Sequence, residues 1–366
     1  MKSNPFFSIC IPCYNHAAFI GKTLESVLAQ DFKDFEIIVS NNASTDNSKE
    51  IVRSFKDSRI RLIENRWNIG FAPNLQQVTR HAQGAFFNLL SSDDLMNPGA
   101  LSTYANLIQQ HSERKDDLVL MSQVWDIDEY GKIIGYRCKS KTAFEPVRVK
   151  VPSQEEIQAQ PLSETYEGFM LFTHAMKRFN TVGAFCSMVY SKELWNRVEG
   201  YNSTQLISPD MHFIHKVLKL DPLVVYVNRP LYSYRTHSMG QAAQQRRNAT
   251  LRFQADQYNY LMHYNENWLQ GVGITTAYQR QLFVERDCIR IALSILRKGN
   301  WTFSSRLLAF AWAAYPDITV RNFKAWILFF LLLSGPLGIA VLWLVFKLIH
   351  RPSLPSIGEV AGQTKL

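Results

Sequence analysis

Residues 85–94 of the chain read AFFNLLSSDD, in which a mostly apolar run is followed at once by four small polar or acidic residues. A short, largely apolar run is typical of a strand that is covered on both faces of a sheet. The residues after it then form the loop at the carboxyl end of that strand. Ligands of open α/β sheets bind outside this edge. The stretch therefore predicts both a fold class and the place of a site.

Three more apolar runs precede this one, and they alternate with amphipathic segments. The runs are Phe7–Ile11, Phe35–Val39 and Ile60–Ile63, and the helical segments are His16–Leu28, Ser44–Phe55 and Asn74–His81. Strands that alternate with helices predict a parallel sheet with helices on both faces. Polar clusters at residues 12–15, 40–42 and 91–94 follow three of these strands. We expect the three clusters to converge on one edge of the sheet.

The second half of the chain has a less regular pattern. Strands are predicted at Leu118–Trp125, Lys132–Arg137, Val147–Val151 and Leu223–Val227, and a helix at Tyr166–Arg178. Beyond Gln241 the pattern is helical throughout, at Arg246–Tyr264, Thr275–Leu296 and Ser304–Ala314. Basic residues concentrate on these last helices. They do not lie beside exposed stacking aromatics, so we expect no binding of nucleic acid.

The composition is that of a globular protein. With 366 residues there is room for about two domains and an appendage. A hydrophobic content of 46% with 19% charged residues excludes a disordered, collagen-like or coiled-coil chain. The net charge of +9 suits an anionic membrane surface or a phosphorylated ligand. Five scattered cysteines form neither a metal quartet nor a disulfide framework, which favours a reducing compartment.

Residues Ala325–Phe346 contain no charged side chain. This length suffices for one bilayer crossing at about 1.5 Å per residue. Lys324 and Lys347 flank the segment, and Ser334-Gly335-Pro336 interrupts its centre, so both a kinked span and a shallow re-entrant hairpin stay open. We expect the segment to attach the protein to a membrane.

Three sets of residues could carry chemistry. Adjacent carboxylates at Asp93 and Asp94 suit a hard divalent cation, although an acidic pair before Asn-Pro-Gly also forms turns. Asp210 follows Ser-Pro at a predicted helix start, where it is either a functional carboxylate or a helix cap. His237 is isolated in the sequence, and a lone histidine is more often structural than a ligand.

Taken together and in order, these residues resemble those of the inverting family 2 glycosyltransferases of GT-A fold, of the bacterial cell-surface polysaccharide type. Seven motifs between about residues 6 and 240 carry the resemblance: SICIPCYN, FEIIVSNNASTDNS, NRWNIGFAPN, QGAFFNLLSSDD, NTVGAFCSMVYSKELWNRVEGYN, LISPDMHF and RPLYSYRTHSMG. A sugar-1-phosphate nucleotidyltransferase has a glycine-rich loop and a basic residue after its first strand, and PCYNH at residues 12–16 offers neither. A dinucleotide oxidoreductase needs Gly-x-Gly-x-x-Gly, which is absent here.

The resemblance implies an α/β fold, namely a GT-A mixed sheet flanked by helices, followed by a C-terminal helical region and a membrane-associated hydrophobic helix. The domain organisation that we expect is a nucleotide-sugar-binding half at residues 1–110, an acceptor-binding and catalytic half at 111–245, a basic helical region at 246–320, a membrane-associated segment at 321–350 and a tail at 351–366.

The resemblance also assigns donor-binding residues by position. Those expected to bind the nucleotide or the donor sugar are Pro12, Tyr14, Asn15, Asn41, Asn68, Gly70, Ser91, Asp94 and Arg235. Asn41 and Ser91 stand where most family members have aspartate. An Asn carbonyl can still accept a hydrogen bond from a pyrimidine, but without charge. Arg235 is expected to contact the diphosphate, as a charged bidentate donor.

The catalytic and metal-binding residues follow in the same way. Asp210 falls on the position of the catalytic base. Asp93 falls on the last position of an Asp-x-Asp motif, which implies that it contacts a divalent cation, Mn²⁺ or Mg²⁺, together with His237. Pro209 replaces the usual glutamate neighbour of the base.

The resemblance then implies inverting transfer of a sugar from a nucleotide-diphospho-sugar, with UDP as the commonest carrier, to a hydroxyl of a glycan acceptor. Basic helices before an apolar segment favour a polyprenyl-linked glycan at the cytoplasmic face of the inner membrane, in polysaccharide, O-antigen or capsule synthesis, with attachment through residues 325–346. The alternative is a catalytically degenerate GT-A domain that serves as a membrane scaffold, because Ser91, Asn41 and Pro209 depart from the family pattern.

Overall fold

The structure is a computed structural model of the chain, and it describes residues 4–139, 146–178, 182–202, 208–238, 251–262, 266–271 and 273–335. By its internal contacts the chain divides into two compact units. The first consists of Met1–Asn248 with Asn259–Thr275, and the second of Ala249–Tyr258 with Thr276–Leu366. The expected boundaries at residues 110, 245, 320 and 350 stay predictions.

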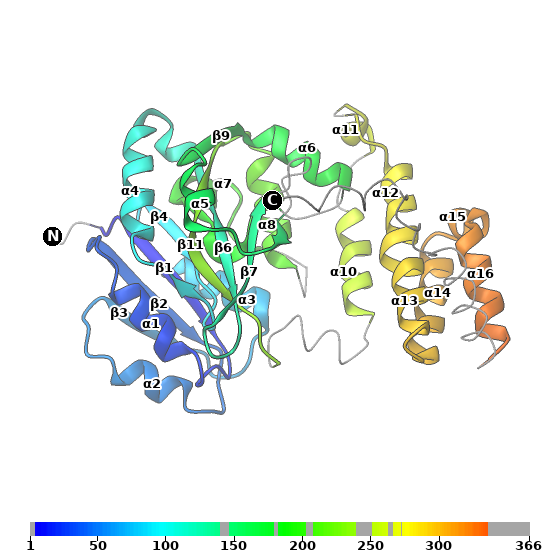
Figure 1. Cartoon of the computed structure of the whole chain (residues 1–366), viewed down its shortest axis with the longest axis horizontal. Coiled ribbons are helices and arrows are strands. Elements are labelled where there is room, and N and C mark those ends of the chain that lie inside the picture. Colours follow the sequence, from blue (N-terminus) through cyan, green and yellow to red (C-terminus); the bar gives the residue numbers. More distant parts are fainter. Residues whose placement is uncertain are drawn as a thin grey trace, which may run out of the picture. The chain divides into compact units, whose positions relative to one another are not determined.

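One mixed sheet forms the centre of the first unit (Figure 1). Its strands are β1 (Phe7–Cys13), β2 (Phe35–Asn41), β3 (Ile60–Glu64), β4 (Phe86–Leu89), β5 (Leu95–Met96), β6 (Leu118–Ile127), β7 (Ile133–Lys139), β8 (Pro146–Val149), β9 (Ser163–Glu167), β10 (Val189–Ser191) and β11 (Leu223–Arg235). The main path runs β3-β2-β1-β4-β10-β6-β11-β5. The first four strands of this path are parallel, as their apolar runs predicted, and β10 is antiparallel to both of its neighbours.

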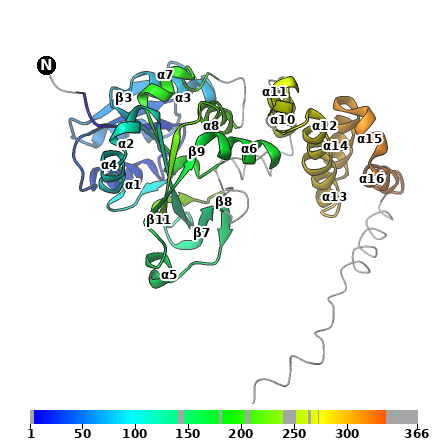
Figure 2. The ribbon, with the colours of Figure 1, turned by 90° about the horizontal axis from the view of Figure 1, so that it is seen from above.

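Helices cover both faces of this sheet. Those of the first unit include α1 (Ile20–Leu28), α2 (Ser48–Ser54), α3 (Phe71–Arg80), α4 (Ala100–Gln110), α5 (Gln154–Gln158), α6 (Gly168–Arg178), α7 (Lys192–Arg197), α8 (Pro209–Leu218) and α11 (Glu266–Gly271). Helices α1, α2 and α4 share one core with alternate residues of β1 and β2, and α3 and α7 pack against the other face. Figure 2 shows β7, β8 and α5 on the side of this unit away from α3 and α7.

The sequence explains why β1 is central. All seven of its residues are buried, so every side chain meets a helix or a neighbouring strand. Helix α1 follows directly and buries Ile20, Leu24 and Val27, which recur at the spacing of one helical face. Because β1 lies between β2 and β4, the loops after these three strands emerge at the same edge.

Some element boundaries differ from the predicted ones. Tyr166 lies in β9, and the predicted helix begins at Gly168, because residues 163–167 pair with the long central strand β11. Strand β10 has three residues, too short for a recognisable pattern. Of the predicted helix Arg246–Tyr264, the structure describes α10 (Arg252–Leu261), which spans the division between the units.

The described elements of the second unit are helical. They are α12 (Thr276–Leu282), a π-helical stretch at Phe283–Arg290, α13 (Ile291–Leu296), α14 (Trp301–Ala314), α15 (Pro316–Arg321) and α16 (Phe323–Leu333). No helix among the described residues combines the length and the apolar character that a bilayer crossing requires. Residues 336–346 of the predicted apolar segment lie outside the described part of the chain, so the membrane-associated helix stays a prediction.

Candidate active site at the carboxyl edge of the sheet

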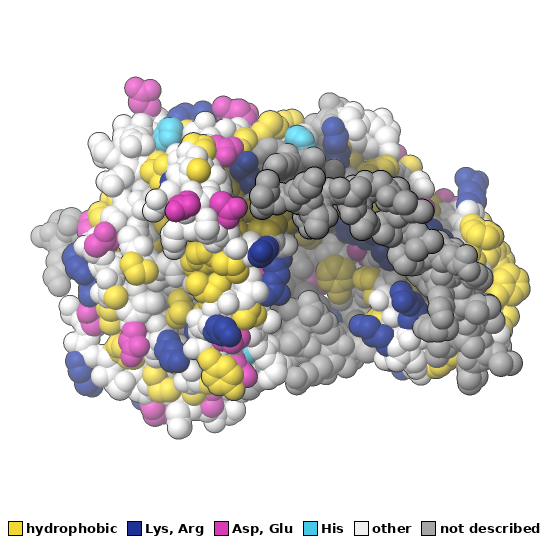
Figure 3. All heavy atoms as spheres, viewed as in Figure 1, with side chains coloured by type: hydrophobic (Ala, Val, Ile, Leu, Met, Phe, Trp, Pro, Cys, Tyr) yellow, Lys and Arg dark blue, Asp and Glu magenta, His cyan; other side chains and the backbone are white. Residues whose placement is uncertain are grey.

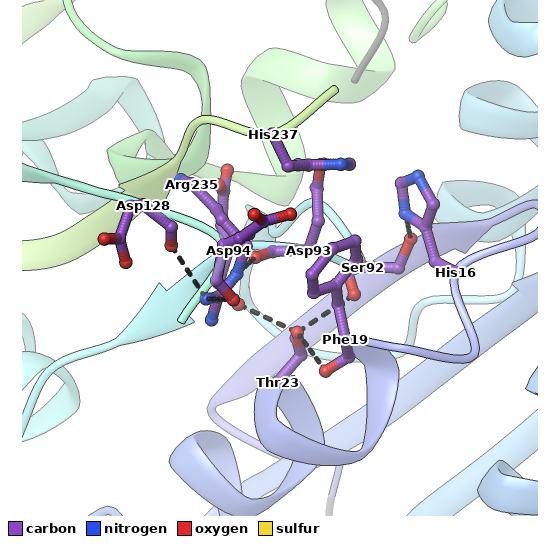
Figure 4. A network of polar contacts seen from close by, with 10 residues as sticks. His16, Phe19, Thr23, Ser92, Asp93, Asp94, Asp128, Arg235 and His237 are labelled. Carbon is purple, nitrogen blue, oxygen red and sulfur yellow. Dashed lines mark hydrogen bonds and ion pairs between the residues drawn. The ribbon is translucent and has the colours of Figure 1, made fainter. Parts of the chain in front are cut away.

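Three segments of the first unit meet at the carboxyl edge of the sheet: the loop after β1, the loop after β4 and the end of β11 (Figure 4). Hydrogen bonds join them directly. Arg235 at the end of β11 bonds to the loop of Asp93 and Asp94, and His16 after β1 bonds to Ser92 of the same loop. The predicted convergence of polar clusters is present in the structure.

Asp93 and His237 lie side by side, although 144 positions separate them in the chain. Asp93 Oδ2 is 2.8 Å from His237 Nε2, and the two side chains are 15% and 1% exposed. The ring of Phe19 packs against the imidazole of His237, with 4.4 Å between the ring centroids. His237 Nδ1 is buried, and it has no hydrogen-bond partner among the described residues. A buried polar atom without a partner usually marks a place that a ligand, ion or water fills.

Arg235 ties two loops together through main-chain oxygens. Its Nε donates to the carbonyl of Asp93 at 2.7 Å, and one Nη donates to the carbonyls of Asp128 and Glu129 at 3.1 and 3.0 Å. The other guanidinium nitrogen, Nη2, is buried and unpaired within the described residues. Burial lowers the pKa of Arg235, and the nearby carboxylates oppose that change. An arginine keeps its charge in such a place, so Nη2 is a cationic donor without an acceptor.

Asp94 holds the end of β11 in position. Its side chain is almost completely buried, and Oδ1 accepts a hydrogen bond from the Arg235 backbone N–H at 2.8 Å. Its own carbonyl accepts from the Thr23 hydroxyl on α1 at 2.9 Å. Burial, and then the neighbouring Asp93, raise the pKa of Asp94 well above its ordinary value. Its expected place beside the donor sugar stays a prediction. Ser91 opens this loop, and its carbonyl accepts from the Asp94 backbone N–H.

His16 belongs to the same cluster, and the sequence reasoning missed it. Nδ1 of its ring lies 2.7 Å from Ser92 Oγ, and its backbone N–H donates to Ser48 Oγ. One ligand atom each of His16, Asp93 and His237 can be chosen so that all three lie within 4.8 Å of one another. Burial lowers the pKa of His16, which favours the neutral imidazole that metals bind. A histidine directly after the Pro-x-Tyr-Asn turn was the available signal.

These donor types fit a divalent cation. Imidazole nitrogen and carboxylate oxygen are ordinary ligands of first-row divalent metals. The buried, unpaired His237 Nδ1 and the convergence of three ligand atoms are what such a site needs before it is loaded. Asp93 and His237, predicted as metal ligands, therefore lie in the one described cluster of the structure that could hold a metal.

The residues expected around the nucleotide line the neighbouring loops. Asn15 has a left-handed backbone, with φ of 54°, and its Oδ1 accepts from the Thr45 backbone N–H at 2.8 Å. Asn41 ends β2 almost fully buried, and its Oδ1 accepts from the Ser44 backbone N–H at 3.3 Å. Tyr14 is 43% exposed, whereas Pro12 is buried inside β1. Their contacts with a nucleotide stay predictions.

Asn42, which the sequence reasoning also missed, organises the loop of Asn68 and Gly70. Its Oδ1 accepts from the Asn65 side chain and from the Ile69 backbone N–H, at 3.1 and 2.9 Å. Its Nδ2 donates to Asn68 Oδ1 and to the Gly70 carbonyl, at 2.9 and 3.1 Å. Gly70 has φ of 89°, a conformation that glycine adopts at no steric cost. The only signal in the sequence for the role of Asn42 was its place beside Asn41.

Asp210 lies in the first turn of α8, half-buried, after Pro209 at the start of the helix. Burial raises the pKa of its carboxyl to about 6. Asp210 also acts electrostatically on Tyr201, which lines a cavity of about 410 Å³. The residues around this cavity are Pro73, Gln76, Arg80, Glu199, Tyr201 and Asn202. No hydrogen bond or ion pair between described residues joins Asp210 to the Asp93 cluster, so its role as the base stays a prediction.

Comparisons with known proteins show which fold and which family this chain resembles. The mixed sheet resembles that of GT-A glycosyltransferases: TarS of Staphylococcus aureus, residues 1–349, solved with UDP-GlcNAc, matches with a TM-score of 0.52 at 14% identity, covering 92% of this chain and 83% of that one. At this identity the likeness shows the fold alone. The model of the family described as "Glycosyl transferase family 2" matches residues 8–163. The recognition from the motifs is confirmed: residues 8–163 match the model of the family 2 glycosyltransferases, and the chain has glycosyltransferases among its curated relatives.

Curated relatives agree with this assignment. The chain is 26% identical to glycosyltransferase GlyG of Streptococcus pneumoniae over 63% of its own length and 71% of that protein's. It is 29% identical to the putative glycosyltransferase EpsE of Bacillus subtilis over 36% of its length and 47% of that protein's. It is 36% identical to the GalNAc(5)-diNAcBac-PP-undecaprenol beta-1,3-glucosyltransferase of Campylobacter jejuni over 30% of its length and 35% of that protein's.

Proposed function

We propose that the protein transfers a sugar from a nucleotide-diphospho-sugar, with UDP the first candidate, to a hydroxyl of a glycan acceptor with inversion at the anomeric carbon. One observation carries the proposal. Arg235 Nη2 and His237 Nδ1, two buried polar atoms of one segment, are unpaired within the described residues, beside the carboxylate of Asp93. A diphosphate offers anionic oxygens to the guanidinium, and a divalent cation suits the imidazole of His237 together with the carboxylate of Asp93.

The chain's own residues have separate parts in this mechanism. Arg235 binds the diphosphate of the donor through its free Nη2. Asp93 and His237 would hold the divalent cation, which would supply positive charge for the departing nucleoside diphosphate. Asp210 removes the proton from the acceptor hydroxyl as that oxygen attacks the anomeric carbon. A carboxylate with a pKa near 6 is ionised at neutral pH and is still basic enough for this step.

Two relatives support the choice of substrates. TarS, which shares the fold, was solved with UDP-GlcNAc, and the Campylobacter jejuni relative is named for a lipid-linked oligosaccharide acceptor. We therefore propose a polyprenyl-linked glycan acceptor at the cytoplasmic face of the inner membrane. Exposed apolar side chains on α16 support contact with a membrane: Phe323, Phe330 and Leu333 are 76%, 61% and 68% exposed.

The test separates binding from chemistry. A thermal-shift screen of nucleoside-diphosphate sugars with and without Mn²⁺ identifies the donor, because a ligand that binds the folded state raises the melting temperature. With that donor, Asp210→Asn is expected to bind normally and to lose transfer by at least about a hundredfold, as for loss of a general base. Asp93→Ala is expected to lose the part of donor affinity that depends on the metal.

Asp34→Asn is a matched control, because Asp34 is an exposed carboxylate outside the site. It is expected to keep wild-type transfer. NMR of the anomeric proton of the product tests inversion. Substantial turnover by Asp210→Asn removes Asp210 from the role of base. Absence of both transfer and donor hydrolysis in the wild type with Mn²⁺ favours the degenerate scaffold instead.

A further inference from the structure

His16 lies at the cation site with its ring held in one orientation. On one side, Nδ1 is hydrogen-bonded to the hydroxyl of Ser92, a buried residue, at 2.7 Å. Its backbone is fixed as well, because the N–H of His16 donates to Ser48 Oγ and the N–H of Ala17 donates to Asp46 Oδ2. No described residue is hydrogen-bonded to the second ring nitrogen, Nε2. Metal-ligating histidines characteristically have this pattern, with one nitrogen hydrogen-bonded and the other on the metal.

The position of His16 completes a set of three ligands from three segments of the chain. Figure 4 shows His16, Asp93 and His237 on the loop after β1, on the loop after β4 and beyond β11, on the same side of the network. One ring nitrogen of each histidine and one carboxylate oxygen of Asp93 lie within 4.8 Å of one another. The centroids of the two imidazole rings are 5.8 Å apart. Two ligands that contact one ion at about 2 Å each are at most about 4 Å apart, so small side-chain shifts bring all three atoms to a metal.

The loop after β4 has no carboxylate at position 91. Ser91 stands two residues before Asp93, and a serine hydroxyl brings no negative charge to a cation. Asp94, the other acidic residue of the loop, is buried and accepts a hydrogen bond from the Arg235 backbone. Asp93 is then the one carboxylate of this loop that is partly open to a ligand. A third protein ligand would then come from a different segment, and His16 is within reach.

We propose that His16 is a protein ligand of the divalent cation, and that two imidazoles with one carboxylate make this site prefer Mn²⁺ to Mg²⁺. The inference rests on the proposed function only in placing a cation at Asp93 and His237. Mg²⁺ prefers oxygen ligands and gives up its water reluctantly, whereas imidazole suits transition metals. A site with two nitrogen ligands therefore discriminates against Mg²⁺.

Mn²⁺ binding to the full-length protein tests this without any turnover. Free Mn²⁺ is followed by electron paramagnetic resonance, in the absence and in the presence of UDP. His16→Gln is expected to weaken Mn²⁺ binding by at least about tenfold, the smaller of the effects seen when groups around a metal are removed. His81→Gln is the matched control, because His81 is exposed at the end of α3, and it is expected to bind like the wild type.

A spectroscopic readout separates a ligand from a structural residue. Pulsed paramagnetic resonance of bound Mn²⁺ detects directly coordinated imidazole nitrogens. The wild type is expected to show two such nitrogens, and His16→Gln and His237→Gln one each. Ser92→Ala, which removes the partner of Nδ1, is expected to weaken binding while two nitrogens remain.

A second substitution tests the metal preference and guards against a folding defect. His16→Glu is expected to restore Mn²⁺ binding with one nitrogen, and to raise the affinity for Mg²⁺ relative to Mn²⁺, because an oxygen ligand replaces a nitrogen. If Asp93→Ala abolishes Mn²⁺ binding while His16→Gln keeps wild-type affinity and two nitrogens, His16 is not a ligand and the proposed function stands. If the wild type binds no Mn²⁺ with or without UDP, the cation site is wrong for both proposals, and transfer in the presence of EDTA then tests the proposed function alone.

Discussion

Asp210 is the residue whose environment predicts a pH dependence. Asp210 lies half-buried in the first turn of α8. Burial raises the pKa of its carboxyl to about 6, because the charged form is disfavoured away from water. A general base has to be ionised to accept a proton. Activity is therefore present above this pKa and is lost as the pH falls through it.

We expect kcat for transfer to fall about tenfold per pH unit below pH 6, and to be level between pH 7 and 8. The measurement is a pH–rate profile from pH 5 to 8 with a saturating donor. Donor affinity measured over the same range is the control, because Asp210 does not contact the diphosphate in the proposed mechanism. A profile that is flat down to pH 5 contradicts the assignment of Asp210 as the base.

Single residues were predictable from the sequence where a motif marks them, and not where a distant partner gives them their role. Asp93 and His237 were predicted as a metal pair through the resemblance, and the structure places them together. His16 and Asn42 were missed, because their partners Ser92 and Ile69 lie 76 and 27 positions away. No local pattern reports such pairings.

At the scale of elements, the loop between β3 and α3 depends on one side chain of a neighbouring strand end. Asn42 makes four hydrogen bonds to this loop, and its side chain is almost fully buried. Two of these bonds join the Asn42 side chain to backbone groups of the loop, the N–H of Ile69 and the carbonyl of Gly70. Without the Asn42 amide, these two groups lose that partner.

Asn42→Ala is therefore expected to lower the free energy of unfolding by about 1–3 kcal/mol, the cost of leaving buried polar groups unpaired. It is also expected to weaken donor binding. Urea denaturation and thermal shift with the donor measure the two effects. Asn47→Ala is the control: Asn47 is exposed and makes no side-chain capping bond, so its change is expected within about 0.5 kcal/mol. Equal stability of the two variants contradicts the role of Asn42.

The elements themselves were predictable where burial is uniform. Strands β1, β2 and β4 coincide closely with apolar runs, since both faces of these strands are covered. Strand β9, SETYE, has mixed polarity because it pairs at the side of β11, and its last residues were assigned to a helix. Pairing with a partner that is distant in sequence outweighs local pattern there.

On the scale of the whole molecule, the second unit presents an apolar helix face. Helix α16 buries Ala325, Leu328 and Leu331, while Phe323 and Phe330 remain exposed. Figure 3 shows hydrophobic side chains gathered where Figure 1 places α16. Apolar surface of this kind marks a contact with a membrane or a partner.

The double variant Phe323→Ser with Phe330→Ser is expected to weaken binding to anionic vesicles by at least about tenfold, since burying one phenylalanine contributes about 1.5–3 kcal/mol. Co-sedimentation of the full chain with vesicles measures it. Val320→Ser on α15 is the matched control, as an exposed apolar residue outside α16. Unchanged binding by the double variant removes this helix face from the proposed attachment.

The guanidinium of Arg235 donates hydrogen bonds to the carbonyl oxygens of residues 93, 128 and 129, and to none of their side chains. Every amino acid has that oxygen, so these three contacts depend on the course of the chain past the guanidinium. Near residue 128 the Asp128 side chain holds that course, because its Oδ1 accepts from the backbone N–H groups of Tyr130 and Lys132. A sequence pattern does not report contacts of this kind, because the accepting atoms belong to the main chain.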